Sequence, residues 1–156
     1  MLDSGWRTGI QHRYCLVAPD FAPNQPGTGN REPGTLLTRL FIYGTLKRGG
    51  SNHHYLHGQQ FIDVARTLPA YRLFDLGGFP GMVPDDNGTG LSIEGEVWDV
   101  TNECLAGLDV LEAVDEGEYL YEVVPLLPPF DQEQIMGYRY ARPVDSCPDI
   151  GSHWPV

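Results

Sequence analysis

A short apolar run that ends in a Gly-Thr pair is the first feature of this sequence suited to chemistry. Leu40–Tyr43 is followed directly by Gly44, Thr45 and Leu46. This pattern predicts a buried strand that opens into a loop whose backbone N–H groups can face a ligand. Successive N–H groups of this kind bind carboxylates, and the hydroxyl of Tyr43 is a candidate additional donor. The alternative for these residues, taken alone, is a plain buried strand and turn.

Glu112 is the second feature, because it occupies a position where a helix would show an apolar residue. Leu105 and Leu108 mark one face of a helix that Thr101 is suited to cap, and at ~100° per residue Glu112 falls on the same face. Burial disfavours the charged carboxylate, as does the negative end of the helix dipole, so both raise its pKa. A carboxyl group tuned toward neutral pH is suited to general acid/base catalysis. The alternative is a satisfied or half-exposed Glu at a fraying helix end.

Asp109 flanks the same helix face, and we expect it to be a solvated edge residue.

Histidines and cysteines provide weaker candidates. His53 and His57 have the i,i+4 spacing of a helical metal pair, but no Asp, Glu or Cys nearby completes a ligand set, so we predict no metal site. Cys15, Cys104 and Cys147 are far apart and form no CxxC pair. We therefore expect neither a disulfide framework nor a zinc site, which fits a reducing cytoplasm.

The charge of the chain excludes some classes of partner. The formal net charge is -11, and residues 40–156 carry six Lys and Arg against eighteen Asp and Glu. Nucleic acids and anionic membranes both select clustered basic residues, so we expect neither as a partner. No apolar run approaches the ~20 residues that span a bilayer, and no signal-peptide pattern opens the chain. The sequence predicts a cytoplasmic protein that binds a small molecule, as a monomer or weak homodimer.

The 156 residues divide into an extension and one domain. Residues 1–38 contain Gly- and Pro-rich linker sequence and predict an N-terminal extension, either mobile or packed over the domain at 39–156. Many short strands with one clear helix indicate an α+β fold, a small barrel or curled sheet. We expect Trp154 to anchor the C-terminal tail. The expected elements are strands at 40–43, 60–67, 70–76, 91–100, 121–127 and 134–140, helices at 51–57 and 101–114, and a rigid turn at 77–81.

Taken in order, the motifs resemble the gamma-glutamylcyclotransferase-like superfamily over roughly residues 40–154. The matching segments are Tyr43-Gly44-Thr45-Leu46-Lys47-Arg48-Gly49, Asn52-His53, Gly78-Phe79-Pro80-Gly81, Ile93-Glu94-Gly95-Glu96-Val97-Trp98, Leu108-Asp109-Val110-Leu111-Glu112, Glu118-Tyr119 and Tyr138-Arg139-Tyr140-Ala141-Arg142-Pro143-Val144.

The resemblance implies a fold, an activity and a site. The fold would be a small mixed β-barrel with a few flanking helices and a cavity. The activity would be cyclisation of a gamma-glutamyl group to 5-oxoproline with release of the attached amine, without a cofactor. Tyr43, Gly44, Thr45 and Leu46 would bind the substrate, and Glu112 would be the catalytic acid/base.

Two features of the sequence indicate which branches of the superfamily it resembles. Thr45 resembles the gamma-glutamylamine cyclotransferase (AIG2-like) branch more than the glutathione-specific branch. The tail from Glu118 to Trp154 also resembles a small bacterial branch in which some members lack the Glu at the position of Glu112. Its presence here favours retained chemistry. Tyr119 would line the substrate pocket or donate a hydrogen bond to Glu112.

Two other functions fit the same residues. One is gamma-glutamyl acyl transfer or peptide tailoring on the same scaffold, with the same acid. The other is a non-catalytic module that binds a small amino-acid-like ligand, and an acid on an apolar helix face counts against it.

Overall fold

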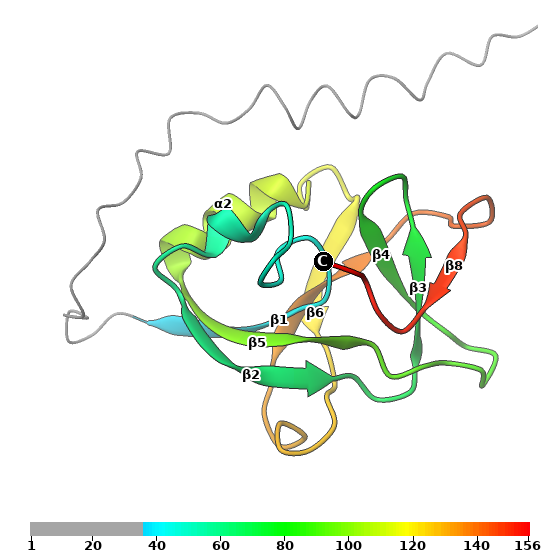
Figure 1. Ribbon diagram of the computed structural model, residues 1–156, viewed down its shortest axis with the longest axis horizontal. Helices are drawn as coiled ribbons and strands as arrows, with labels where there is room; N and C mark the ends of the chain where they lie inside the picture. The colour runs from blue at the N-terminus through cyan, green and yellow to red at the C-terminus, as the bar shows by residue number, and fades with distance from the viewer. Residues whose placement is uncertain (1–35) are drawn as a thin grey trace, which may run out of the picture. The chain divides into compact units, whose positions relative to one another are not determined.

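The computed structural model describes residues 36–156, which form two β-sheets and one α-helix (Figure 1). The elements in chain order are β1 Leu37–Ile42, the 3-10 helix η1 His53–Leu56, β2 Gln60–Arg66, β3 Tyr71–Asp75, β4 Pro80–Pro84, β5 Glu94–Thr101, α2 Asn102–Leu111, β6 Tyr119–Val123, β7 Met136–Tyr140 and β8 Asp149–Gly151. The predicted α+β class is confirmed. The domain proposed at 39–156 begins two residues inside β1, and the proposed extension at 1–38 lies almost wholly outside the described residues.

The larger sheet has five strands in the order β2-β5-β1-β7-β6. β1 pairs with β5 antiparallel and with β7 parallel, which makes the sheet mixed. The smaller sheet is antiparallel, in the order β4-β3-β8. Within residues 36–156 the two sheets do not close into one ring of strands, so the barrel expected from the sequence is a pair of sheets here.

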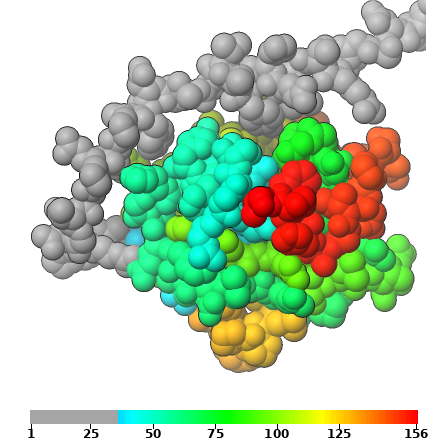
Figure 2. All heavy atoms as spheres, viewed as in Figure 1, coloured from blue at the N-terminus to red at the C-terminus, as the bar shows by residue number. Residues whose placement is uncertain are grey.

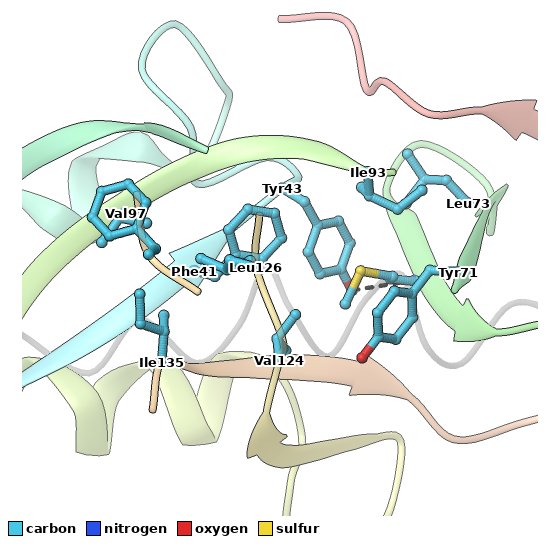
Figure 3. Close-up of a cluster of buried hydrophobic side chains, with 11 residues drawn as sticks. Phe41, Tyr43, Tyr71, Leu73, Ile93, Val97, Val124, Leu126 and Ile135 are labelled. Atoms are coloured by element: carbon cyan, nitrogen blue, oxygen red, sulfur yellow. Dashed lines mark hydrogen bonds between the residues drawn. The ribbon is translucent and has the colours of Figure 1, made fainter. Parts of the chain in front are cut away.

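β1 lies at the centre of the larger sheet because both of its faces are apolar. Side chains alternate across a strand, so Leu40 and Ile42 point to one face and Phe41 and Tyr43 to the other. The two pairs join different buried clusters, and all four side chains are at most 6% exposed. Figure 3 shows the cluster that contains Phe41 and Tyr43. A central strand buried on both faces fixes the loop that follows it.

Helix α2 packs beside the other cluster through Leu108, which is fully buried. Thr101 is its N-cap, as predicted, and the hydroxyl oxygen accepts a hydrogen bond from the Cys104 N–H. The helix ends at Leu111, with Glu112 as C-cap, because Ala113 adopts a left-handed φ of 48°. The expected helix end near residue 114 is therefore three residues too late.

No helix of the described part of the chain is long and apolar enough to cross a membrane.

The sequence pattern does not predict β4 or β8. β4 begins at Pro80, inside the segment expected to be only a rigid turn; that turn does exist at Gly77 and Gly78, which have φ of 108° and 104°. β8 has three residues and is held by β3. Trp154 packs against the cluster of Phe41 and Tyr43, as expected for an anchor of the tail.

Candidate active site

The loop after β1 is folded tightly on itself. The Lys47 N–H donates to the Gly44 carbonyl (3.1 Å), and the Gly50 N–H donates to the Lys47 carbonyl (2.8 Å). Asn52 closes the loop with two bonds to Thr45, from its backbone N–H to the carbonyl and from its side chain to Oγ1, both 3.0 Å. A Cβ at Gly50 would lie 2.1 Å from the Thr45 carbonyl oxygen, so only glycine permits this closure.

The loop leaves three successive backbone donors unbonded. Within residues 36–156, no group accepts a hydrogen bond from the N–H of Gly44, Thr45 or Leu46. This arrangement is that of the free N–H groups at the start of a helix, which attract carboxylates and phosphates. These are the N–H groups that the sequence predicts to face a ligand.

Gly44 packs directly against the first residue of β4. A Cβ at Gly44 would lie 2.7 Å from Pro80 Cγ, so a side chain there displaces the proline ring. The Pro80 carbonyl accepts a hydrogen bond of 2.8 Å from the Tyr119 hydroxyl. The hydrogen bond from Tyr119 to Glu112 that the sequence suggests is absent, because the Tyr119 hydroxyl donates its proton to Pro80. Pro80 of β4 thus connects the loop, through its contact with Gly44, to β6, through its bond with Tyr119.

Glu112 lies at the end of α2 beside these residues. Burial raises the pKa of its carboxyl group to about 8, and the neighbouring carboxylate of Glu118 contributes in the same direction. The direction agrees with the prediction, but Glu118 was not foreseen as a cause. Glu118 is 7% exposed and lies close because the chain turns back after Ala113, whose carbonyl accepts the Glu118 N–H at 3.2 Å.

Three buried tyrosines interact electrostatically with Glu112. Burial first, and Glu112 among the other causes, raises the pKa of the Tyr43, Tyr119 and Tyr138 hydroxyls, so all three are neutral at physiological pH. They come from the end of β1, from β6 and from β7. The structure therefore places Glu112 within the electrostatic reach of both Tyr43, which begins the loop, and Tyr119.

None of these hydroxyls is directed at the acid. Tyr43 donates to the Tyr138 carbonyl (2.8 Å) and accepts from the Met82 N–H (3.2 Å), the bond dashed in Figure 3. Tyr138 donates to Asp109 Oδ1 at 2.6 Å. Asp109 is thus partly buried and bonded, which corrects the expectation of a solvated edge residue. The Tyr43 hydroxyl, considered as a donor to substrate, already has both partners.

The carboxyl group of Glu112 consequently remains available to a ligand. Within the described residues, no donor bonds to its oxygens, and no buried side-chain oxygen or nitrogen lacks a partner. The residue as a whole is only partly buried. A partly buried carboxyl group of raised pKa can take up and release a proton near neutral pH.

Two further features of the described residues lie apart from Glu112. An open pocket of about 570 Å³ is lined by eleven residues that include Lys47, Arg66, Glu96 and His153 but not Glu112. No group of three or more His, Cys, Asp or Glu side chains in residues 36–156 is placed to hold a metal ion. The His53 ring instead bonds to the Leu46 carbonyl at 3.0 Å, beside the loop.

Sequence reasoning missed Asp109, Glu118 and Tyr138 as parts of this region. The bonds from Tyr138 to Asp109 and from Tyr119 to Pro80 join residues 29 and 39 positions apart, which no local pattern reports. Glu118 comes close to Glu112 through the turn after Ala113, and its adjacency to Tyr119 was the only local signal for it.

Comparison with known proteins gives consistent matches. The family model described as gamma-glutamyl cyclotransferase, AIG2-like, matches residues 40–154. A Vibrio cholerae protein named provisionally as a gamma-glutamylcyclotransferase is 38% identical over 112 residues, 72% of this chain and 91% of the relative. The gamma-glutamylcyclotransferase family protein YtfP of Escherichia coli K12 is 36% identical over 114 residues, 73% and 92% of the two chains.

Solved structures share the fold. The crystal structure of an AIG2-like protein from mouse superposes with a TM-score of 0.63 at 26% identity, over 75% of this chain and 88% of the mouse chain. The solution structure of E. coli YtfP gives a TM-score of 0.55 at 33% identity, over 75% and 95% of the two chains.

Proposed function

The chain belongs to the gamma-glutamyl cyclotransferase, AIG2-like family, and we propose that it converts a gamma-glutamyl amine or dipeptide to 5-oxoproline and the free amine. The observation that carries this proposal is the carboxyl group of Glu112, whose pKa is raised to about 8, close to a loop with three free N–H donors. The names of the relatives support the same reaction class.

The reaction begins with capture of the substrate's α-carboxylate by the loop. The unbonded N–H groups of Gly44, Thr45 and Leu46 suit an anionic oxygen, and no side chain is needed for that contact. Fixing this end lets the glutamyl chain bend so that its α-amine approaches its own γ-carbonyl carbon. Because ring closure is intramolecular, correct placement of the two reacting atoms removes much of the barrier.

Glu112 supplies the proton transfers. The ionised carboxylate takes a proton from the substrate's α-ammonium, and the freed amine attacks the γ-carbonyl carbon to form the lactam N–C bond. Glu112 then donates that proton to the departing nitrogen as the old C–N bond breaks. The carboxylate next takes the second proton, which the ring nitrogen loses as it becomes an amide N–H, and passes it to the released amine, which leaves as an ammonium ion. Proton count and electron count are conserved, so these steps require no oxidant, reductant or cofactor. A pKa of about 8 suits both roles, since each protonation state is populated near neutral pH.

The test is Glu112→Gln, which keeps the shape of the side chain and removes the base. General acid/base catalysis contributes about 10²–10⁴-fold, so we expect release of 5-oxoproline to fall at least about 100-fold. Glu103→Gln is the matched control, since Glu103 is exposed in the first turn of the same helix; its turnover should be unchanged.

The substrates of that test form a panel of a gamma-glutamylamine, a gamma-glutamyl dipeptide and glutathione, with 5-oxoproline measured by mass spectrometry. Full turnover by the Gln variant would remove Glu112 from the mechanism. Transfer of the glutamyl group to an added amine, without 5-oxoproline, would show acyl transfer, and binding without any product would show a binding module.

A further inference from the structure

Lys47 is the only lysine of the 156 residues, and its side chain is only 5% exposed. It follows directly after the three free N–H groups of the loop. A buried lysine is rare unless its ammonium has a partner, because removing the charge from water is costly. The reaction proposed above gives Lys47 no role, although it adjoins the site.

The partner of Lys47 is the C-terminal segment. Its Nζ donates a hydrogen bond of 2.6 Å to the backbone carbonyl of Trp154. We call residues 149–156 the tail strap. Figure 2 shows this red segment lying against the cyan segment that follows β1. The two segments also approach at Gly49, where a Cβ would lie 3.7 Å from the Val156 side chain.

The tail strap is itself fixed to the body of the domain. β8 pairs with β3, and the Ser152 carbonyl accepts a hydrogen bond of 2.8 Å from the Glu94 N–H. The Trp154 side chain packs against the buried cluster. The Trp154 carbonyl is therefore a fixed point, and a bond to it restrains Lys47.

Electrostatics favour the same arrangement. Burial lowers the pKa of the Lys47 ammonium, while Glu96 and Glu94 act in the opposite direction and help to keep it charged. Glu96 also accepts hydrogen bonds from the Arg48 N–H (3.2 Å) and the Trp98 indole (3.0 Å). Lys47 and Arg48 are thus anchored at successive positions by different parts of the fold.

We propose that Lys47 is a positioning residue: by bonding to the tail strap, it holds the loop in the conformation that directs the N–H groups of Gly44, Thr45 and Leu46 at a carboxylate. The inference rests on the proposed function for its kinetic test. Lys47 acts through the backbone of the loop and does not take part in the proton transfers. Loss of its bond should weaken substrate capture and leave the chemical step intact.

The kinetic test uses Lys47→Met, which keeps the length and apolar stem of the side chain without a donor. Loss of a hydrogen bond to a charged group changes an equilibrium constant by about tenfold or more. We therefore expect KM for a gamma-glutamylamine to rise about tenfold. We expect kcat to stay within about twofold, because Glu112 is untouched. Lys47→Arg, which retains a charged donor, should recover most of the lost affinity.

The matched control is Arg66→Met. Arg66 lines the same pocket and is paired with Glu94, but it has no bond to the tail strap. If the loss of one positive charge from this pocket were the cause, both Met variants would raise KM equally, and that result would overturn the proposal. A normal KM in Lys47→Met would overturn it as well.

A measurement without substrate separates this inference from the proposed function. Amide hydrogen exchange of residues 44–49 should be faster in Lys47→Met than in the wild type and in Arg66→Met, with melting curves showing that all three are folded. If no gamma-glutamyl compound is turned over, the proposed function fails while hydrogen exchange still tests the strap. Unchanged exchange in Lys47→Met would disprove the strap even if cyclisation were confirmed.

Discussion

At the scale of single residues, Glu112 is held in an environment that opposes its charge. Burial and Glu118 both raise the pKa of its carboxyl group, and the three surrounding tyrosine hydroxyls donate their protons elsewhere. A protein selected for stability alone would have an apolar residue at this position of α2. The arrangement is unfavourable for folding near pH 8 and favourable for proton transfer, as in many catalytic sites.

The pH dependence of stability follows from this shift. Burial and the Glu118 carboxylate raise the pKa of the Glu112 carboxyl group from its ordinary value of 4.5 to about 8 in the folded protein. Between these values the folded protein holds a proton that the unfolded chain has lost, so its contribution to stability is full below pH ~4.5 and is lost as pH rises through ~8. The contribution is at most a few kcal/mol, on the order of 2–4. The Glu112→Gln variant has no carboxyl group at this position, so its stability lacks this pH dependence.

Urea unfolding of the wild type and Glu112→Gln at several pH values measures this effect. The free energy of unfolding of the Gln variant, relative to the wild type, should increase steadily from about pH 5 to about pH 8.5. Activity should change in the opposite sense, with kcat/KM of the wild type increasing toward pH 8 as the base form accumulates. A stability difference that does not vary with pH would show that the pKa of Glu112 is unshifted.

At the scale of elements, the site depends on where strands and helices end. The loop begins where β1 leaves the sheet, and Glu112 lies where α2 stops at the left-handed Ala113. The loop carries three unbonded N–H groups, whereas the carbonyls of Leu108, Asp109 and Val110 at the end of α2 accept hydrogen bonds from residues 112–114. Ends of elements commonly serve as binding sites. Pro80 at the start of β4 connects them, because it contacts Gly44 and accepts the bond from Tyr119.

This contact changes how the loop can be tested. Gly44→Val would place a side chain where a ligand approaches the backbone. In the structure its Cβ would meet Pro80 Cγ at 2.7 Å, so that substitution would disturb the fold and the Tyr119 bond together. A change in the ligand is cleaner than a change in the protein.

Carboxylate capture predicts a difference between two small ligands. 5-Oxoproline should bind at least about tenfold more tightly than 2-pyrrolidinone, the same lactam without the carboxylate, since each charge-assisted hydrogen bond contributes about 1.5–3 kcal/mol. Nitrogen-15 NMR titrations should shift the amide signals of Gly44, Thr45 and Leu46 with 5-oxoproline only. Equal affinities, or shifts confined to other amides, would place the carboxylate elsewhere.

Local sequence signals predicted the elements that carry their own pattern. The apolar run at β1, the alternation in β5 and the Thr101 cap of α2 are properties of neighbouring residues, and all three were found. The sequence pattern did not predict β4, because Pro80 and Gly81 are residue types that normally interrupt strands. Pro is nevertheless tolerated at the first residue of a strand. β8 is too short to show alternation and exists only through its pairing with β3.

At the scale of the whole molecule, the site is assembled from distant segments. Tyr43 and Tyr138 bond across 95 positions, and Lys47 and Trp154 bond across 107. Glu112 and the loop could be nominated from local pattern and resemblance, but their neighbours could not. The order of strands in the sheets decides which buried polar groups lie close together. The periodicity of neighbouring residues does not reveal that order.

The sheet also bears on which residues the domain needs. β1, the central strand of the larger sheet, begins at Leu37. Arg39, near the start of β1, pairs with Asp99 at 2.9 Å and with Glu133 at 2.7 Å. We propose that the folded domain requires the whole of β1 and, because the preceding sequence is Gly- and Pro-rich linker, none of residues 1–35.

Two shortened chains test this proposal. A chain of residues 36–156 should unfold within about 1 kcal/mol of the full-length protein and should keep its turnover within about twofold. A chain of residues 40–156 lacks the ladder positions of Leu37, Thr38 and Arg39 opposite Thr101, Val100 and Asp99. It should lose about 2 kcal/mol or more, because the β5 end that leads into the cap of α2 loses its partner. Urea unfolding and 5-oxoproline release measure both chains. If the 36–156 chain proved unstable or inactive, residues 1–35 would belong to the domain.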